Sequence, residues 1–205
     1  MTDAPKILIA VPTAAEIHAM TAMTCHQLAK RPDRSFVALV GRPVDYVRNC
    51  IMRLWRDKFP TYSHLLMVDS DTVLPLDAIE TLLALDATVA TGCYPLMYND
   101  GPRWALSELS GQQDRGRYRL LKDLPKTDAP FEVEGCGAGC LMLRRDIFEH
   151  VAYPWFRWIE QEDGLLVGED FYFCDRVREA GLTIIADPRV VCRHIKAIDL
   201  MGLIN

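Results

Sequence analysis

The chain has 205 residues, half of them hydrophobic, and a formal net charge of −5 at pH 7. This length fits one domain with a sizeable core, and the charge excludes the strongly basic field of a dedicated nucleic-acid binder. Uncharged apolar stretches stay shorter than the roughly 18 residues that a membrane span needs. We therefore expect a single globular domain over residues 1–205.

The cysteines indicate a reducing environment. There are seven, an odd number at irregular spacing, and the start of the chain has no signal-peptide pattern. Reduced thiols fit this usage, so we expect a cytoplasmic protein. A zinc site at Cys136 and Cys140 is disfavoured, because no second cysteine pair lies at zinc-finger spacing.

The first half of the chain alternates between strand-like and helix-like segments. Short apolar runs predict strands at 6–11, 35–40, 64–68 and 87–93. Helices are predicted at 14–30, 44–58 and 76–85, between those runs. This alternation is typical of an α/β fold with a largely parallel sheet flanked by helices.

Regularity is lost between residues 96 and 130, which we predict to be an irregular loop. Long loops in compact domains are usually functional. Between Arg103 and Lys126, six basic residues stand against three acidic ones, which leaves open a solvated face or a basic rim for an anionic ligand. Regular structure is expected to resume at 131–133, with strands at 140–143 and 183–186 and helices starting near 145 and 169.

Asp69, Ser70 and Asp71 follow the apolar run 64–68, where a buried strand should end. In extended backbone, residues two apart point the same way, so both carboxylates could face one divalent cation. Ligands also bind at the carboxyl ends of strands in open α/β sheets. The plainer alternative is an acidic turn that caps the next helix.

Three further features accompany this tripeptide. The glycine-rich segment 135–139 allows close approach to a ligand, or simply a tight turn. Glu169 and Asp170 begin a predicted helix, where they suit either the helix dipole or general-base catalysis. His194 is either structural or a ligand that completes a carboxylate metal site.

In this order and spacing, the motifs resemble nucleotide-sugar-dependent glycosyltransferases of the GT-A fold, in particular the inverting, family-two-like bacterial and phage enzymes. The resemblance covers about residues 6–194. It implies a Rossmann-like domain with a mostly parallel sheet and a small antiparallel extension on the acceptor side, next to the irregular loop at 96–130. This chain is shorter than many such enzymes. The acidic residue that often follows the second strand and holds the nucleobase of the donor is not obvious near residues 40–42.

The resemblance also implies a role for individual residues. Asp69, Asp71 and His194 would bind Mn²⁺ or Mg²⁺, and Asp170 would be the catalytic base. The nucleotide-sugar would contact Pro12, Thr13, Arg48, Asn49, Asp69 and Ser70. The acceptor and the transferred sugar would contact Gly137, Ala138, Trp155 and Glu169.

The implied function is metal-dependent transfer of a sugar, with inversion, from a nucleoside-diphosphate sugar to an acceptor hydroxyl. A UDP-sugar is favoured over a GDP-sugar, and the acceptor could be a glycan, a lipid-linked sugar, a protein or a modified DNA base. Two alternatives are a non-catalytic sugar-nucleotide or glycan-binding module on the same fold, and a nucleotidyltransferase. Residues 12–16 argue against the nucleotidyltransferase, because they lack a glycine-rich loop bearing Lys or Arg.

Overall fold

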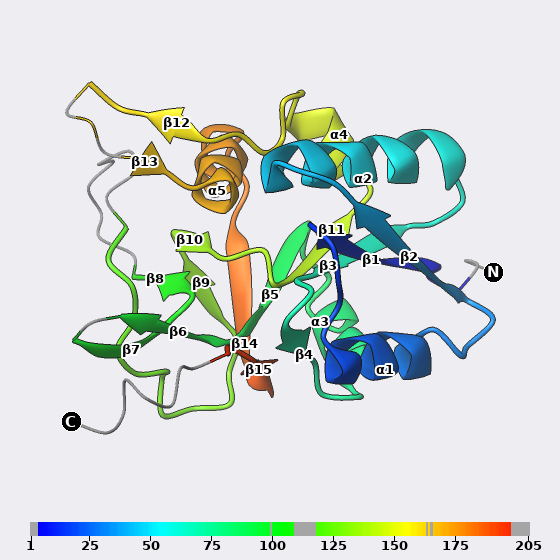
Figure 1. Cartoon of the computed structure of the whole chain (residues 1–205), viewed down its shortest axis with the longest axis horizontal. Helices are drawn as coiled ribbons and strands as arrows, with labels where there is room; N and C mark the ends of the chain where they lie inside the picture. The colour runs from blue at the N-terminus through cyan, green and yellow to red at the C-terminus, as the bar shows by residue number, and fades with distance from the viewer. Residues whose placement is uncertain (1–3, 99, 109–117, 163, 165, 198–205) are drawn as a thin grey trace.

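A seven-stranded mixed sheet forms the centre of the protein (Figure 1). The structure is a computed structural model, and it describes residues 4–98, 100–108, 118–162, 164 and 166–197. The strand order is β2-β1-β3-β11-β5-β14-β9. The strands are β1 (Ile7–Thr13), β2 (Arg34–Val40), β3 (His64–Val68), β5 (Val89–Cys93), β9 (Phe131–Val133), β11 (Cys140–Arg144) and β14 (Ile184–Val191). Only β9 and β11 run against the other five, so the sheet is largely parallel, as predicted.

Helices cover both faces of this sheet (Figure 1). They are α1 (Ala19–Leu28), α2 (Val44–Lys58), α3 (Ala78–Leu83), α4 (Ile147–His150) and α5 (Glu169–Glu179). Leu8 and Ala10 of β1 pack into one core cluster with α2, α4 and α5, whereas Ile7 and Ile9 pack into a second cluster with α1 and α3. Both faces of β1 are therefore buried, which explains why its sequence is a continuous apolar run.

Four small antiparallel pairs surround the main sheet. They are β4 (Thr72–Val73) with β15 (Arg193–His194), β6 (Pro95–Tyr98) with β7 (Gly101–Trp104), β8 (Leu106–Ser107) with β10 (Gly135–Cys136), and β12 (Ile159–Glu160) with β13 (Leu166–Val167). The prediction of an irregular loop throughout 96–130 is therefore wrong for its first part, which contains β6, β7 and β8. These strands are too short, and too interrupted by proline and glycine, to show a period-two pattern. Residues 109–117 of that loop lie outside the described residues.

The first helix begins later than its sequence predicts, at Ala19 instead of residue 14. The hydroxyl of Thr13 donates to the carbonyl of Glu16 and accepts from the N–H of Ala15, which holds these residues in a turn. His18 then caps the helix by accepting from the N–H of Met20. Local side-chain hydrogen bonds of this kind compete with helix formation.

Asn49 ties α2 to the segment that contains Trp155 and Phe156. Its amide nitrogen donates to the carbonyls of Asp45 and Phe156, at 2.8 and 2.6 Å. Its amide oxygen accepts from the N–H groups of Trp155 and Phe156, at 3.0 and 3.3 Å. All three residues are buried, so this amide satisfies backbone groups that water does not reach.

We expect Asn49→Ala to lower the free energy of unfolding by about 1–3 kcal/mol, because buried backbone groups lose their partners. Urea denaturation measures the change. Lys58→Ala, at the exposed end of the same helix, is the control and should stay within about 0.5 kcal/mol of the wild type. Equal stability of the two variants would contradict the structural role of Asn49.

Candidate active site

A buried arginine connects the acidic motifs at the carboxyl edge of the sheet. Arg48 lies on α2, and its guanidinium contacts Asp69 Oδ1 at 2.7 Å and Glu169 Oε1 at 3.1 Å. Burial alone would lower the pKa of Arg48, but the charges of Asp69 and Glu169 raise it above its usual range. The arginine therefore stays charged and fixes the end of β3 against the start of α5.

Asp69, Ser70 and Asp71 form a tight turn and not an extended strand end. The N–H of Thr72 donates to the carbonyl of Asp69 at 3.0 Å, which closes the turn. The expectation that both carboxylates point the same way rests on the alternation of side chains in extended backbone. That alternation does not apply to this turn, although both residues line one cavity. Asp69 accordingly binds Arg48, while Asp71 meets the C-terminal strand.

Asp71 and His194 come together because β15 pairs with β4. His194 lies opposite Thr72 in that pairing, and its Nε2 is 3.4 Å from Asp71 Oδ1. Lys196 Nζ contacts the other carboxylate oxygen of Asp71 at 2.6 Å. Burial opposes ionisation of Asp71, but His194 and Lys196 outweigh it and lower the pKa of Asp71 to about 2. Asp71 is therefore charged at neutral pH.

The chemistry of this pair suits a divalent cation. His194 Nδ1 lies 2.8 Å from the carbonyl of Pro95, an acceptor, so Nδ1 carries the proton in the neutral ring. The contact with Asp71 raises the pKa of His194, because protonated Nε2 donates to that carboxylate. In the neutral ring Nε2 has a lone pair on the side of Asp71, and this is the form that binds a metal. Among the residues that the structure describes, there is no group of three or more His, Cys, Asp or Glu side chains that could hold a metal ion by themselves. Asp71 and His194 therefore fit a cation that takes its other ligands from a substrate, as Mg²⁺ commonly does.

A cavity of about 400 Å³ opens onto these residues. The residues predicted from the sequence that line it are Pro12, Thr13, Arg48, Asp69, Ser70, Asp71, Glu169, Asp170 and His194. They come from β1, α2, the turn after β3, the start of α5 and β15. Motifs far apart in the sequence thus meet in one place.

Asp170 lies where this cavity meets a second one of about 800 Å³, since its side chain lines both. Burial and the neighbouring charge of Glu169 raise the pKa of Asp170 to about 7, against the opposing effect of Arg48. Its Oδ1 accepts from the N–H of Phe171 at 2.8 Å. A carboxylate with this proton affinity can accept a proton near neutral pH.

Four residues predicted to contact ligands have other surroundings in the structure. Asn49 and Trp155 are in the core contacts described above, and neither lines the two cavities. Gly137 and Ala138 are buried as well. A Cβ at Gly137 would overlap the hydroxyl of Tyr94, so this glycine is needed for packing against Tyr94.

Sequence reasoning missed Tyr94 and Lys196, which also line the smaller cavity. Tyr94 follows β5 and accepts through its hydroxyl from the N–H of Gly139, at 3.1 Å. Nothing in the local sequence marks Tyr94, because its partner is 45 residues away. Lys196 could have been found, since it lies two residues after His194, at the spacing that places strand side chains on one face.

No protein-family model and no curated protein sequence matches the chain. Solved structures share its fold. A197 from STIV matches with a TM-score of 0.64 and 20% identity, over 94% of this chain and 86% of A197. GalNAc-T7, solved with UDP, GalNAc and Mn²⁺, matches with a TM-score of 0.59 and 13% identity, over 97% of this chain and 45% of GalNAc-T7. The chain thus spans less than half of GalNAc-T7, and it has the GT-A fold that its sequence predicts.

The raised pKa of Asp170 predicts a dependence of stability on pH. The folded protein keeps a proton up to about pH 7 that the unfolded chain releases near its ordinary pKa of 3.8. The resulting stabilisation is complete below about pH 4 and is lost as the pH rises through about 7. Asp170→Asn should therefore match the wild type near pH 4 and exceed its free energy of unfolding at pH 8, by up to about 4 kcal/mol.

Urea denaturation at a series of pH values tests this. Asp128→Asn, which replaces an exposed aspartate outside both cavities, is measured beside it as the control. If the difference between Asp170→Asn and the wild type were constant over this range, the environment assigned to Asp170 would be wrong.

Proposed function

We propose that the protein is a metal-dependent glycosyltransferase that moves a sugar from a nucleoside-diphosphate sugar to an acceptor hydroxyl, with inversion. One observation carries the proposal: Asp170, with a pKa near 7, lies between two cavities, one of which contains the Asp71–His194 pair. A donor in the smaller cavity and an acceptor in the larger would meet at this carboxylate. The GT-A fold supports the same interpretation.

The smaller cavity is the proposed donor site. Asp71 and His194 would hold Mn²⁺ or Mg²⁺, which when bound neutralises the charge that develops on the departing nucleoside diphosphate. Lys196 adds a further positive charge at the same carboxylate. Pro12 and Thr13, at the end of β1, form another part of the cavity wall and would contact the nucleoside. Because the solved structure of GalNAc-T7 contains UDP and Mn²⁺, a UDP-sugar with Mn²⁺ is the first donor to test.

Asp170 is the proposed base. It would take the proton of the acceptor hydroxyl as that oxygen attacks the anomeric carbon from the face opposite the leaving group, which gives inversion. Glu169 cannot readily do the same, because Arg48 holds its carboxylate. Its charge instead strengthens the proton affinity of Asp170.

The donor proposal predicts a metal-dependent thermal shift. At a ligand concentration about 100 times Kd, binding contributes about 2.7 kcal/mol and raises Tm by roughly 5–10 °C. We expect this shift with a UDP-sugar and Mn²⁺ together, when UDP-, GDP-, CMP- and dTDP-sugars are compared with and without the metal. Asp71→Ala should abolish it, whereas Asp57→Ala, an exposed control, should not.

A nucleotide shift of equal size with and without Mn²⁺ would contradict the metal requirement and assign charge neutralisation to Lys196. No shift with any nucleotide sugar would contradict the donor site itself.

The base proposal predicts that Asp170→Asn keeps the nucleotide shift but loses turnover. Release of nucleoside diphosphate, with water as the acceptor, should fall by about 10²–10⁴-fold because the variant lacks a proton acceptor. In the wild type, this rate should rise with pH up to about 7 and then level off, as Asp170 loses its proton. Full activity of Asp170→Asn would show that the base is another residue.

A further inference from the structure

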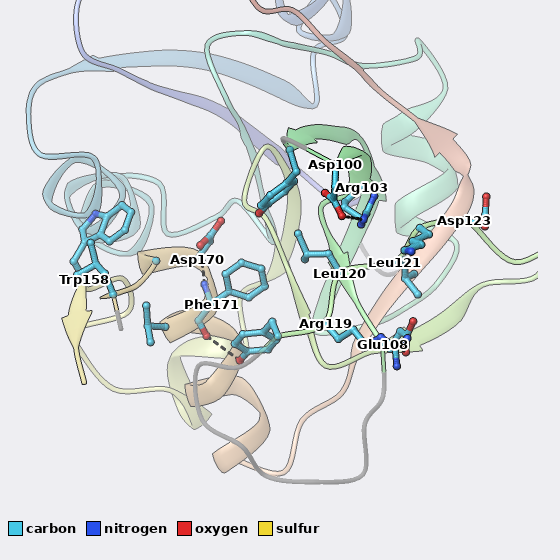
Figure 2. A pocket seen from close by; sticks show the side chains of 16 residues that line it. Asp100, Arg103, Glu108, Arg119, Leu120, Leu121, Asp123, Trp158, Asp170 and Phe171 are labelled. Atoms are coloured by element: carbon cyan, nitrogen blue, oxygen red, sulfur yellow. Dashed lines mark hydrogen bonds and ion pairs between the residues drawn. The ribbon is translucent and has the colours of Figure 1, made fainter. Parts of the chain in front are cut away.

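The larger cavity, of about 800 Å³, lies between two hairpins. Tyr98 and Arg103 line it from the β6–β7 hairpin, and Leu166 lines it from the β12–β13 hairpin. Both hairpins lie on the side of the sheet away from β1 and β2 (Figure 1). Figure 2 shows Asp170 in this cavity between Trp158 and the Asp100–Arg103 pair. A ligand held between these groups would therefore have Asp170 within its reach.

Large apolar side chains are exposed around this cavity. Trp158 is 43% exposed, Tyr98 is 49% exposed and Leu166 is 58% exposed. Exposed apolar groups that gather at a hollow indicate a binding site more than single scattered ones do. Tyr and Trp offer flat, rigid surfaces with a polar tip, which suit ligands that have both apolar and hydrogen-bonding groups. A sugar ring has this character, because its C–H groups can lie on an aromatic face while its hydroxyls point outward.

Four of the charged side chains that line the cavity lie in two pairs of opposite charge. Arg103 forms an ion pair with Asp100, and Arg119 lies 3.7 Å from Glu108. Paired carboxylate and guanidinium groups at one rim provide acceptors and donors together, which suits neighbouring hydroxyls on a ring. They would orient the sugar without requiring it to carry a charge.

The balance of charge in the cavity also bears on the class of ligand. Apart from Asp170, the described lining residues include three basic side chains, Arg103, Arg119 and Lys122, and three acidic ones, Asp100, Glu108 and Asp123. A site for nucleic acid or a lipid phosphate requires an excess of positive charge, as phosphate binding does in general. The described lining of the cavity, in which Asp100 balances the excess of basic residues from the segment 103–126, therefore does not support a basic rim for an anionic acceptor. A neutral ligand fits this lining better.

We propose that this cavity binds a neutral saccharide, with a sugar ring against Trp158 and Tyr98 and a hydroxyl directed toward Asp170. This deepens the proposed function and rests on it, since it makes the acceptor a glycan. The volume lies within the range of about 300–1,000 Å³ that is usual for small-molecule sites. The cavity is thus large enough to hold a sugar ring as well as the hydroxyl that reacts.

Binding of neutral methyl glycosides tests the proposal without the need for a donor. Saturation-transfer NMR with the methyl glycosides of glucose, galactose, mannose, N-acetylglucosamine and N-acetylgalactosamine should detect at least one that binds the wild type. Trp158→Ala should weaken that binding roughly tenfold, about 1.4 kcal/mol, while Trp158→Phe should keep most of it. Tyr46→Ala, which removes an exposed aromatic ring on α2 outside both cavities, should change nothing.

Absence of binding by every glycoside, or binding that Trp158→Ala leaves unchanged while circular dichroism shows a folded variant, would overturn the proposal.

The proposed transferase function and the proposed saccharide site fail in different ways. A nucleotide shift without glycoside binding would keep the transferase and reject the saccharide acceptor. Glycoside binding that depends on Trp158, without any nucleotide shift, would keep the saccharide site and make the protein a glycan-binding module.

Discussion

The contact of Arg48 with Asp69 and Glu169 is the interaction on which the rest of the site depends. It joins α2, the turn after β3 and the first residue of α5 through one buried guanidinium. Removing one member of such a group leaves an uncompensated buried charge, which typically costs about 3–5 kcal/mol. The position of Asp170 is fixed by the same contact, because it is the next residue after Glu169.

The surroundings of Asp170 and Asp71 shift the pKa values of these two carboxyl groups in opposite directions. Arg48 binds Glu169 directly and acts on Asp170 only as a charge at longer range, so burial and Glu169 dominate and Asp170 is costly to ionise. Asp71 has the opposite surroundings, because its contacts with His194 and Lys196 favour its charged form. Two aspartates in one cavity thus have pKa values of about 2 and about 7, a separation that suits one for charge binding and the other for proton transfer.

Much of the fold could be predicted because its signals are local. The spacing of Val47, Ile51 and Trp55 predicts α2 with the bounds that the structure shows, since one face of that helix is buried. The gathering of the motifs at one sheet edge follows from parallel strands, whose carboxyl ends meet there. The turn at Asp69, the hairpins and the core position of Trp155 could not be read in this way. They depend on partners distant in sequence, such as Asn49 for the backbone of Trp155, 106 residues away.

The pairing of β15 with β4 affects the order in which parts of the protein fold during synthesis. Lys196 and Asp71 are 125 residues apart, and His194 reaches Asp71 only through this pairing. During synthesis, which proceeds from the N-terminus, the first three strands can emerge and pair long before β15 exists. The electrostatic environment of Asp71 is therefore completed only after β15 has been made. A ribosome that stalls after β14 would release a chain with most of its core but without the groups that make Asp71 part of a site.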